Sequence, residues 1–295
     1  MFLSIVIPTY NRAHLIENTL KSVLDQTCPD FEVIIVDDGS TDNTREVVAP
    51  YISEQVHYYL VENGERGAAR NFGTGKATGN YVNWLDSDDL LLPNHVADIL
   101  EAATQNKFPE ILVFDYKNYF PGADTYTSSH TSPETINHSS RNLIHGNCFS
   151  CNSVIVREDI ARENLFSENR QLSASEDYEL WLRLAAKYPI LGINKITSVI
   201  IHHPERSVLT MNQVEQLENR FNTFIELTTS NPEVKQFLAG KIGYFKMRNY
   251  LVLAVDLAYK GHKSRSKKYV SIAIRNSKRA FSQRVFWATL KHLLF

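Results

Sequence analysis

The chain has 295 residues, 43% of them hydrophobic, which suffices for one large globular domain or for one domain with an appendage. Its best candidate for a membrane span, residues 250–259, is too short and contains Asp256, which argues against a membrane-spanning protein. The net charge of −2 conceals an uneven distribution, because residues 260–295 hold ten Lys or Arg and no Asp or Glu. Residues 1–259 therefore carry a net charge of −12, and the basic end favours an anionic partner.

The cysteines and the first residues indicate a cytoplasmic protein. Three cysteines, an odd number, are typical of a reducing compartment. Cys148 and Cys151 form a Cys-x-x-Cys pair, but there is no second pair to complete a zinc site, so we predict a reduced structural pair. Residues 1–8 lack a basic segment and a cleavage site, which favours a first strand over a signal peptide.

The first 115 residues alternate between apolar strands and amphipathic helices, an order that predicts a parallel sheet with helices on both faces. Asn11 is the predicted cap of the first helix, Thr41 or Asp42 that of the second, and Pro93 lies in the first turn of a later helix. The predicted strands are 3–7, 31–36, 56–61, 81–85 and 111–115, and the first three helices are about 11–26, 41–52 and 63–77.

Beyond residue 115 the pattern is less regular. Residues 120–147 are rich in Ser, Thr, His, Pro and Gly, which predicts a functional loop or a disordered segment. A helix capped by Ser173 or Ser175 has Leu180, Trp181 and Leu184 on its inner face. The other predicted elements are a strand at 152–156, a helix from about 158, a last strand at 198–201 and helices throughout from 211.

Polar clusters follow three of the predicted strands, at Pro8–Asn11, Asp37–Ser40 and Asp86–Asp89. Ligands in parallel sheets bind beyond the carboxyl ends of the strands, where these clusters meet. The three carboxylates of Asp86–Asp89 repel one another unless a cation lies between them, and oxygen ligands suit Mg²⁺ or Mn²⁺. The alternative is a solvated acidic turn that caps a helix.

A second acidic pair, Glu176 and Asp177, begins the helix after Ser175. Negative side chains stabilise the first turn of any helix, so this pair is equally typical of an ordinary helix start. There is no Gly-x-Gly-x-x-Gly after the first strand and no complete phosphate-loop motif, which disfavours a nicotinamide, flavin or P-loop enzyme.

The order of these motifs resembles the inverting family 2 glycosyltransferases with the GT-A fold. The resemblance runs from Ser4 to about Ser207 and implies an α/β, Rossmann-like, mostly parallel sheet with helices on both faces, plus a C-terminal helical extension. We therefore expect a GT-A catalytic domain at 1–210, with a nucleotide-binding half at about 1–115 and an acceptor half at about 116–210, and a basic helical extension at 211–295. The matching motifs are Ile5–Asn11, Val36–Asp42, Gly67–Gly73, Asp86–Asp89 and Glu176–Asp177.

The resemblance also implies roles for individual residues. Asp88 ligates a Mn²⁺ or Mg²⁺ ion directly, and Asp86 is a second ligand, a water-mediated ligand or a ribose contact. Asp177 is the general base, Glu176 orients the acceptor, and Asp38 accepts a hydrogen bond from the pyrimidine base. The other residues expected at the nucleotide are Pro8, Thr9, Tyr10, Arg70 and Arg206, while His202 and His203 are either further contacts or metal ligands, or ordinary loop histidines.

The implied function is metal-dependent, inverting transfer of a hexosyl or N-acetylhexosaminyl group. The donor is a nucleotide-diphospho-sugar, a UDP-sugar, and the acceptor is a hydroxyl of a glycan or lipid-linked sugar in bacterial surface polysaccharide synthesis. The Gln-x-x-Arg-Trp motif of processive synthases is absent, which favours transfer of one or a few sugars. The alternatives are a nucleotidyltransferase, whose glycine-rich loop is missing at residues 8–11, and a non-catalytic nucleotide-sugar binding module. No nucleic-acid partner is expected.

The basic end allows two interpretations. Residues 269–281 fit an amphipathic helix with Tyr269, Ile272 and Ala273 on its apolar side, and residues 286–295 add a second apolar patch. Either these patches pack on the catalytic domain, or residues 260–295 attach the protein peripherally to the anionic inner face of the cytoplasmic membrane.

Overall fold

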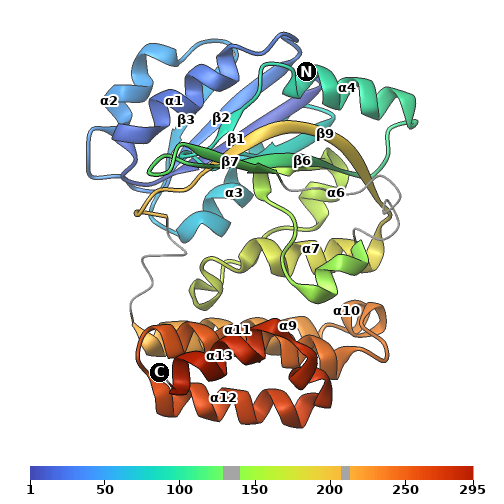
Figure 1. Cartoon of the computed structure of the whole chain (residues 1–295). Coiled ribbons are helices and arrows are strands. Elements are labelled where there is room, and N and C mark those ends of the chain that lie inside the picture. Colours follow the sequence, from blue (N-terminus) through green and yellow to red (C-terminus); the bar gives the residue numbers. More distant parts are fainter. Residues whose placement is uncertain (129–139, 207–212, 295) are drawn as a thin grey trace.

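The computed structural model describes residues 1–128, 140–206 and 213–294 as a mixed α/β protein (Figure 1). The strands are β1 (Leu3–Thr9), β2 (Phe31–Asp37), β3 (Val56–Leu60), β4 (Tyr81–Trp84), β5 (Leu90–Leu91), β6 (Ile111–Phe120), β7 (Thr125–Ser128), β8 (Val154–Arg157) and β9 (Ile190–Ile201). The α-helices are α1 (Ala13–Leu24), α2 (Thr44–Val48), α3 (Glu65–Lys76), α4 (His95–Gln105), α6 (Glu158–Glu163), α7 (Glu176–Lys187), α9 (Val214–Ser230), α10 (Pro232–Phe237), α11 (Ile242–Tyr259), α12 (Lys263–Asn276) and α13 (Arg284–Leu294). Short 3-10 helices are η1 (Ala49–Tyr51), η3 (Leu143–His145), η4 (Cys151–Ser153), η5 (Arg170–Leu172) and η6 (Lys278–Ser282).

One sheet runs through the molecule in the order β3-β2-β1-β4-β8-β6-β9-β5, with β7 paired to β6. The predicted parallel arrangement is confirmed for β3, β2, β1 and β4. The other half is mixed, because β8 lies antiparallel between β4 and β6, while β6 and β9 are parallel. The carboxyl ends of β1, β2 and β4 therefore meet at one edge of the sheet.

The second half of the sheet departs from the predicted elements. Strand β9 begins at Ile190, whereas the prediction began it at Ser198. The earlier part was missed because the residues around Asn194 and Lys195 are exposed and lack the apolar run that signals a strand. Strand β6 continues to Phe120, and β7 falls inside the segment predicted to be irregular. Residues 129–139 of that segment lie outside the described residues.

The starts of three helices, α1, α2 and α4, also differ from prediction. Asn11 does not cap α1, because it has a φ of 50° and its side-chain oxygen accepts hydrogen bonds from the Thr41 and Asp42 amides at 2.8 and 3.3 Å. It thereby joins the loops after β1 and β2. Helix α2 begins only at Thr44, and Pro93 precedes α4 instead of lying in its first turn.

Two apolar cores lie on the two faces of the sheet. Successive side chains of β1 alternate between them: Ile5 and Ile7 pack with α1 and α4, whereas Val6 packs with α3, α6 and α7. Figure 1 shows α9 to α13 as a further layer beyond α7. Because α9 and α10 pack directly on α7, this layer is attached to the side of the molecule that carries Glu176 and Asp177.

The apolar side predicted for the basic end is largely buried inside this helical layer. Tyr269, Val270 and Ala273 of α12 pack with Leu251 and other residues of α11 in a third core. In the described part of the basic end, residues 260–294, the exposed large aromatic side chains are Phe281 at 49% and Trp287 at 60%. Within the described residues, none of the helices combines the length and the hydropathy needed to cross a membrane.

Candidate functional site

A cavity of about 460 Å³ opens at the edge where β1, β2 and β4 end, a size typical of small-molecule sites. It brings together motifs that are distant in sequence, and it also receives Gln216 from α9. Its lining residues are Pro8, Thr9, Tyr10, Arg12, Asp38, Asn63, Glu65, Arg66, Asp86, Ser87, Asp88, Ser173, Arg206 and Gln216.

The β2 side of this cavity presents a fixed hydrogen-bond acceptor. The Asp38 carboxylate accepts a hydrogen bond from the Gly64 amide at 2.7 Å and one from the Asn63 side chain at 3.2 Å. Burial, opposed in part by the backbone amides of Gly64 and Glu65, raises the pKa of Asp38 above its usual range. The side chain is thus held in place by the loop that follows β3.

Three carboxylates after β4 form a group whose oxygens lie within 4.8 Å of one another, those of Asp86, Asp88 and Asp89. Asp88 Oδ2 lies 2.9 Å from His203 Nε2. Asp89 is buried and differs in its partners, because its Oδ1 accepts from the Ile201 amide at 3.0 Å and from Arg206 at 2.8 Å. Asp88, Asp86 and His203 therefore offer the more available ligand atoms, whereas Asp89 anchors the end of β9 and Arg206.

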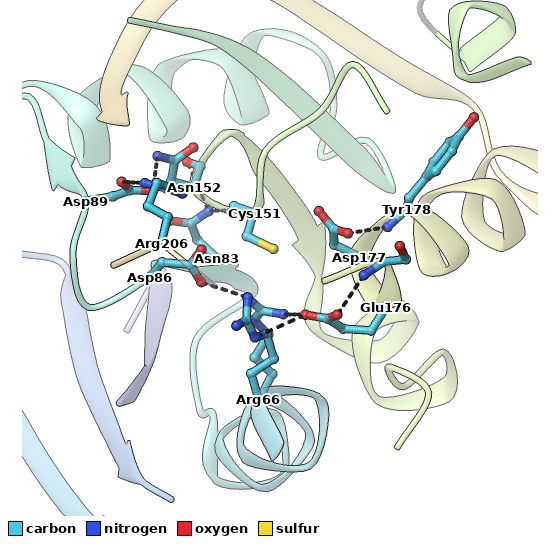
Figure 2. A network of polar contacts seen from close by, with 12 residues as sticks. Arg66, Asn83, Asp86, Asp89, Cys151, Asn152, Glu176, Asp177, Tyr178 and Arg206 are labelled. Atoms are coloured by element: carbon cyan, nitrogen blue, oxygen red, sulfur yellow. Dashed lines mark hydrogen bonds and ion pairs between the residues drawn. The ribbon is translucent and has the colours of Figure 1, made fainter. Parts of the chain in front are cut away.

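A buried arginine connects this group to the second acidic pair. Arg70 of α3 is 1% exposed and donates to Asp86 Oδ1 at 2.7 Å and to Glu176 Oε1 at 2.8 Å. Arg66, one turn earlier, lies 3.6 Å from the same oxygen of Glu176. Burial disfavours the ionised form of Asp86, but Arg70, Arg66 and Arg206 outweigh it and hold the pKa of Asp86 below its usual range. Figure 2 shows this network, with Asp86 and Glu176 at its two ends.

Asp177, the next residue along α7, has neutral partners. Its Oδ1 accepts from the Tyr178 amide at 2.7 Å (Figure 2). Its Oδ2 accepts from the Asn147 side chain at 2.9 Å. Burial and the negative charge of Glu176 raise the pKa of Asp177 to about 6. A carboxylate with this pKa is suited to accept a proton near neutral pH.

The residues predicted for the nucleotide, the metal and catalysis divide into those that line the cavity and those that do not. Arg70 and Glu176 lie in the buried network beneath the cavity rather than among its lining residues, and Asp177 lies beyond them. His202 contacts Asn118 at 2.9 Å, away from the aspartates. The predicted residues that do line the cavity are Pro8, Thr9, Tyr10, Asp38, Asp86, Asp88 and Arg206.

Several residues of the site were not found from the sequence. Arg66 directly precedes the motif that begins at Gly67, so its position was the available signal. Asn147 lies in the irregular segment and Gln216 in the helical extension, where no local pattern distinguishes them from other polar residues.

Comparisons with known proteins agree with this geometry. Residues 4–162, more than half of the chain, match the sequence model of Glycosyl transferase family 2. The chain is 26% identical over 255 residues to the UDP-Glc:alpha-D-GlcNAc-diphosphoundecaprenol beta-1,3-glucosyltransferase WfgD of Escherichia coli, covering 85% of this chain and 93% of WfgD. It is 33% identical over 215 residues to an uncharacterised glycosyltransferase of Rickettsia conorii, which is 67% of this chain but only 32% of that longer protein.

Solved structures share the fold. The S. aureus TarS fragment 1–349 in complex with UDP-GlcNAc aligns over 99% of this chain and 92% of its own, with a TM-score of 0.65 and 18% identity. The mannosyltransferase PcManGT from Pyrobaculum calidifontis, in complex with GDP-Man and Mn²⁺, aligns over 99% of this chain and 87% of its own, with a TM-score of 0.56 and 17% identity. These likenesses confirm the predicted fold class.

Proposed function

The chain belongs to Glycosyl transferase family 2 and is a glycosyltransferase, and from this premise we propose that it transfers a hexosyl or N-acetylhexosaminyl group from a UDP-sugar, with inversion, to a lipid-linked sugar. The observation that carries the proposal is the division of the site into a cavity with an aspartate group and a separate carboxylate of raised pKa, joined by Arg70. We assign residues 1–210 to the catalytic domain and residues 211–295 to an appended helical extension.

The donor occupies the cavity in this proposal. Asp38 accepts from the N–H of the pyrimidine, with Pro8, Thr9 and Tyr10 around the base. WfgD and TarS support the choice of donor, since the name of WfgD specifies UDP-Glc and the TarS fragment was solved in complex with UDP-GlcNAc. Arg206, which lines the same cavity beside Asp89, faces the diphosphate as a fixed positive charge.

The ligand atoms fit a divalent cation. Asp88 and His203 would hold it, together with the oxygen of Asp86 that does not bind Arg70. A carboxylate and imidazole set favours Mn²⁺ over Mg²⁺, because Mg²⁺ binds mainly to oxygen. The ion, when bound, stabilises the negative charge that develops on the leaving nucleoside diphosphate.

The acceptor reacts at α7. Asp177 takes the proton from the acceptor hydroxyl, and the hydroxyl oxygen attacks the anomeric carbon from the face opposite the departing diphosphate, which inverts the centre as in inverting glycosidases. Asn147 holds the carboxylate of Asp177 in place, and Arg70 keeps the neighbouring Glu176 turned away from it. Glu176 is thus a positioning residue for the acceptor side.

A scan of nucleotide sugars tests the donor assignment. With Mn²⁺ present, one UDP-sugar should raise the melting temperature of the protein more than GDP-sugars and ADP-sugars do. The same compound should release UDP when a sugar linked to an undecaprenyl diphosphate analogue is added. Stabilisation by GDP-sugars alone, or UDP release that does not depend on any acceptor, would overturn the proposal.

We also propose peripheral attachment to an anionic membrane, on which such an acceptor resides. Arg284, Trp287 and Lys291 are all exposed and lie on one face of α13, at positions i, i+3 and i+7. Tryptophan is favoured at membrane interfaces, and each basic residue near an anionic leaflet contributes about 1 kcal/mol. The sequence suggested the apolar side of α12 as the lipid contact, but that side is buried. We propose this face of α13 as the lipid contact instead.

Co-sedimentation with vesicles tests the attachment. The protein should pellet with vesicles that contain phosphatidylglycerol, and high salt or the double change Trp287→Ala and Lys291→Gln should reduce the bound fraction. Phe108→Ala, which removes an aromatic side chain of similar exposure (49%) from the catalytic half, is the matched control and should bind like wild type. Equal pelleting with purely zwitterionic vesicles would refute attachment to an anionic membrane.

A further inference from the structure

A cationic site lies between the proposed base and the C-terminal helices. Arg248 of α11 donates from Nε and one terminal nitrogen to the backbone oxygen of His145, at 3.2 and 2.6 Å. Its other terminal nitrogen donates to the side-chain oxygen of Gln283 at 3.1 Å. Both acceptors are neutral, so in the described parts of the chain these bonds do not balance the charge of Arg248.

A second positive charge stands close by. Lys241 directly precedes α11, and Lys241, Tyr244 and Arg248 are spaced at i, i+3 and i+7, which places them on one face of the helix. Burial, followed by the charges of Arg248 and Lys241, lowers the pKa of His145. The lowered pKa leaves His145 neutral at pH 7, and its Nδ1 lies 2.9 Å from the hydroxyl of Tyr244. Arg248 and Lys241 thus form a pair of cations beside uncharged polar groups.

This pair of cations is connected to the proposed base, Asp177, through a short segment of the chain. Asn147, whose side chain holds Asp177, is only two residues from His145, or at most about 7 Å along the backbone. Asp177 and Arg248 therefore both contact the segment 145–147, and a sugar with its hydroxyl at Asp177 can place a substituent near Arg248. A guanidinium has five N–H donors, and the three hydrogen bonds to His145 and Gln283 leave two of them for an anion.

We propose that Arg248 and Lys241 bind the diphosphate of a lipid-linked acceptor, so that the sugar receiving the new residue is the one attached directly to that diphosphate. The inference rests on the proposed transfer to a lipid-linked sugar and adds where the acceptor's phosphates lie. Gln283, which follows η6 and directly precedes α13, lies on the other side of Arg248, so the lipid chain leaves the site toward the face of Arg284 and Trp287. An acceptor with a long glycan would put its diphosphate out of reach of these cations.

Binding of farnesyl diphosphate tests the site without turnover. Calorimetry on the full chain in EDTA, which removes metal-dependent binding in the donor cavity, should show an affinity that Arg248→Gln weakens about tenfold, the lower end expected for a charge-assisted hydrogen bond. Lys241→Gln should weaken it about threefold, and Arg248→Lys should retain most of it because the charge remains. Farnesol, which has no phosphate, reports any binding due to the chain alone and should respond equally little to each variant.

Lys246→Gln is the matched control. Lys246 is on the same helix but two residues from Arg248, on a different side, so its loss should leave the affinity unchanged. Equal affinity of wild type and Arg248→Gln, or no binding of farnesyl diphosphate by wild type, would refute the subsite. Such a result would leave the UDP release assay intact, and only failure of that assay would refute the proposed function.

Discussion

The carboxylates after β4 and those at the start of α7 lie on opposite sides of Arg70, and they differ in their neighbours. Asp86 bonds to Arg70, Asp89 bonds to Arg206, and Asp88 contacts His203. Asp177 instead receives its hydrogen bonds from an amide side chain and a backbone amide. The burial of Asp86 is outweighed by Arg70, Arg66 and Arg206, which hold its pKa below the usual range. Burial raises the pKa of Asp89 to about 7 in spite of Arg206, and burial with the charge of Glu176 raises that of Asp177 to about 6. Because Asp86, Asp88 and Arg206 line the cavity and Asp177 lies outside it with amide partners, the proposed function gives cation and diphosphate binding to the first group and proton transfer to Asp177.

The strongest test of the first group is Asp88→Asn. The amide is nearly isosteric but neutral, so we expect turnover to fall below detection and metal-dependent UDP binding to weaken strongly. The fold should survive, because the change relieves repulsion among the three carboxylates. Activity assays and calorimetry with and without Mn²⁺ measure both effects, and wild-type activity in the variant would remove Asp88 from the metal site.

The corresponding test of the second group is Asp177→Asn. Removing a positioned general base should lower kcat by about 10²–10⁴-fold, whereas UDP affinity should barely change because Asp177 lies on the acceptor side. Measurements of kcat and of the UDP dissociation constant separate the two. A variant that turns over normally but binds UDP tenfold less tightly would instead place Asp177 with the donor.

Disruption of the connection between the two groups should affect stability. Arg70→Gln leaves the buried Glu176 and the partly exposed Asp86 without their shared cation. Breaking a buried ion pair such as Arg70–Glu176 typically costs about 3–5 kcal/mol. Arg66→Gln, at a side chain that is 27% exposed and 3.6 Å from Glu176, should cost about 1 kcal/mol or less. Urea denaturation measures the free energy of unfolding of both variants. Equal destabilisation would contradict the expectation that Arg70 stabilises the two acidic groups more than Arg66 does.

The smallest effect is expected from pH. The raised pKa of Asp177 means that its carboxyl keeps a proton up to about pH 6, and a base must be deprotonated to act. The rate should therefore fall as the pH drops through about 6, by up to tenfold per unit. The residual activity of Asp177→Asn should lack this decrease. A wild-type rate that stays constant from pH 7 to pH 5 would contradict the assignment of the base.

The predictable parts of this protein are those with strictly local signals. The strands up to Trp84, the loops that follow them and the first turn of α7 were all marked by apolar runs or by polar residues at strand ends. The length of β9 was not marked by a local signal, because its partly exposed middle lacks an apolar run. Asn11 was predicted to cap a helix that it does not cap, because its hydrogen-bond partners lie 30 residues away.

The sequence alone therefore determined the fold class and the position of both acidic groups, since strand periodicity and strand-end chemistry depend on neighbouring residues. Only the tertiary structure decided how adjacent acids differ. No local pattern separates the environments of Glu176 and Asp177, yet Glu176 binds Arg70, 106 residues away, and Asp177 binds Asn147. Electrostatic environment depends on which charges and amides the fold brings within a few ångströms, and for this pair those partners come from a different strand-helix unit and from an irregular loop that carries no periodic signal.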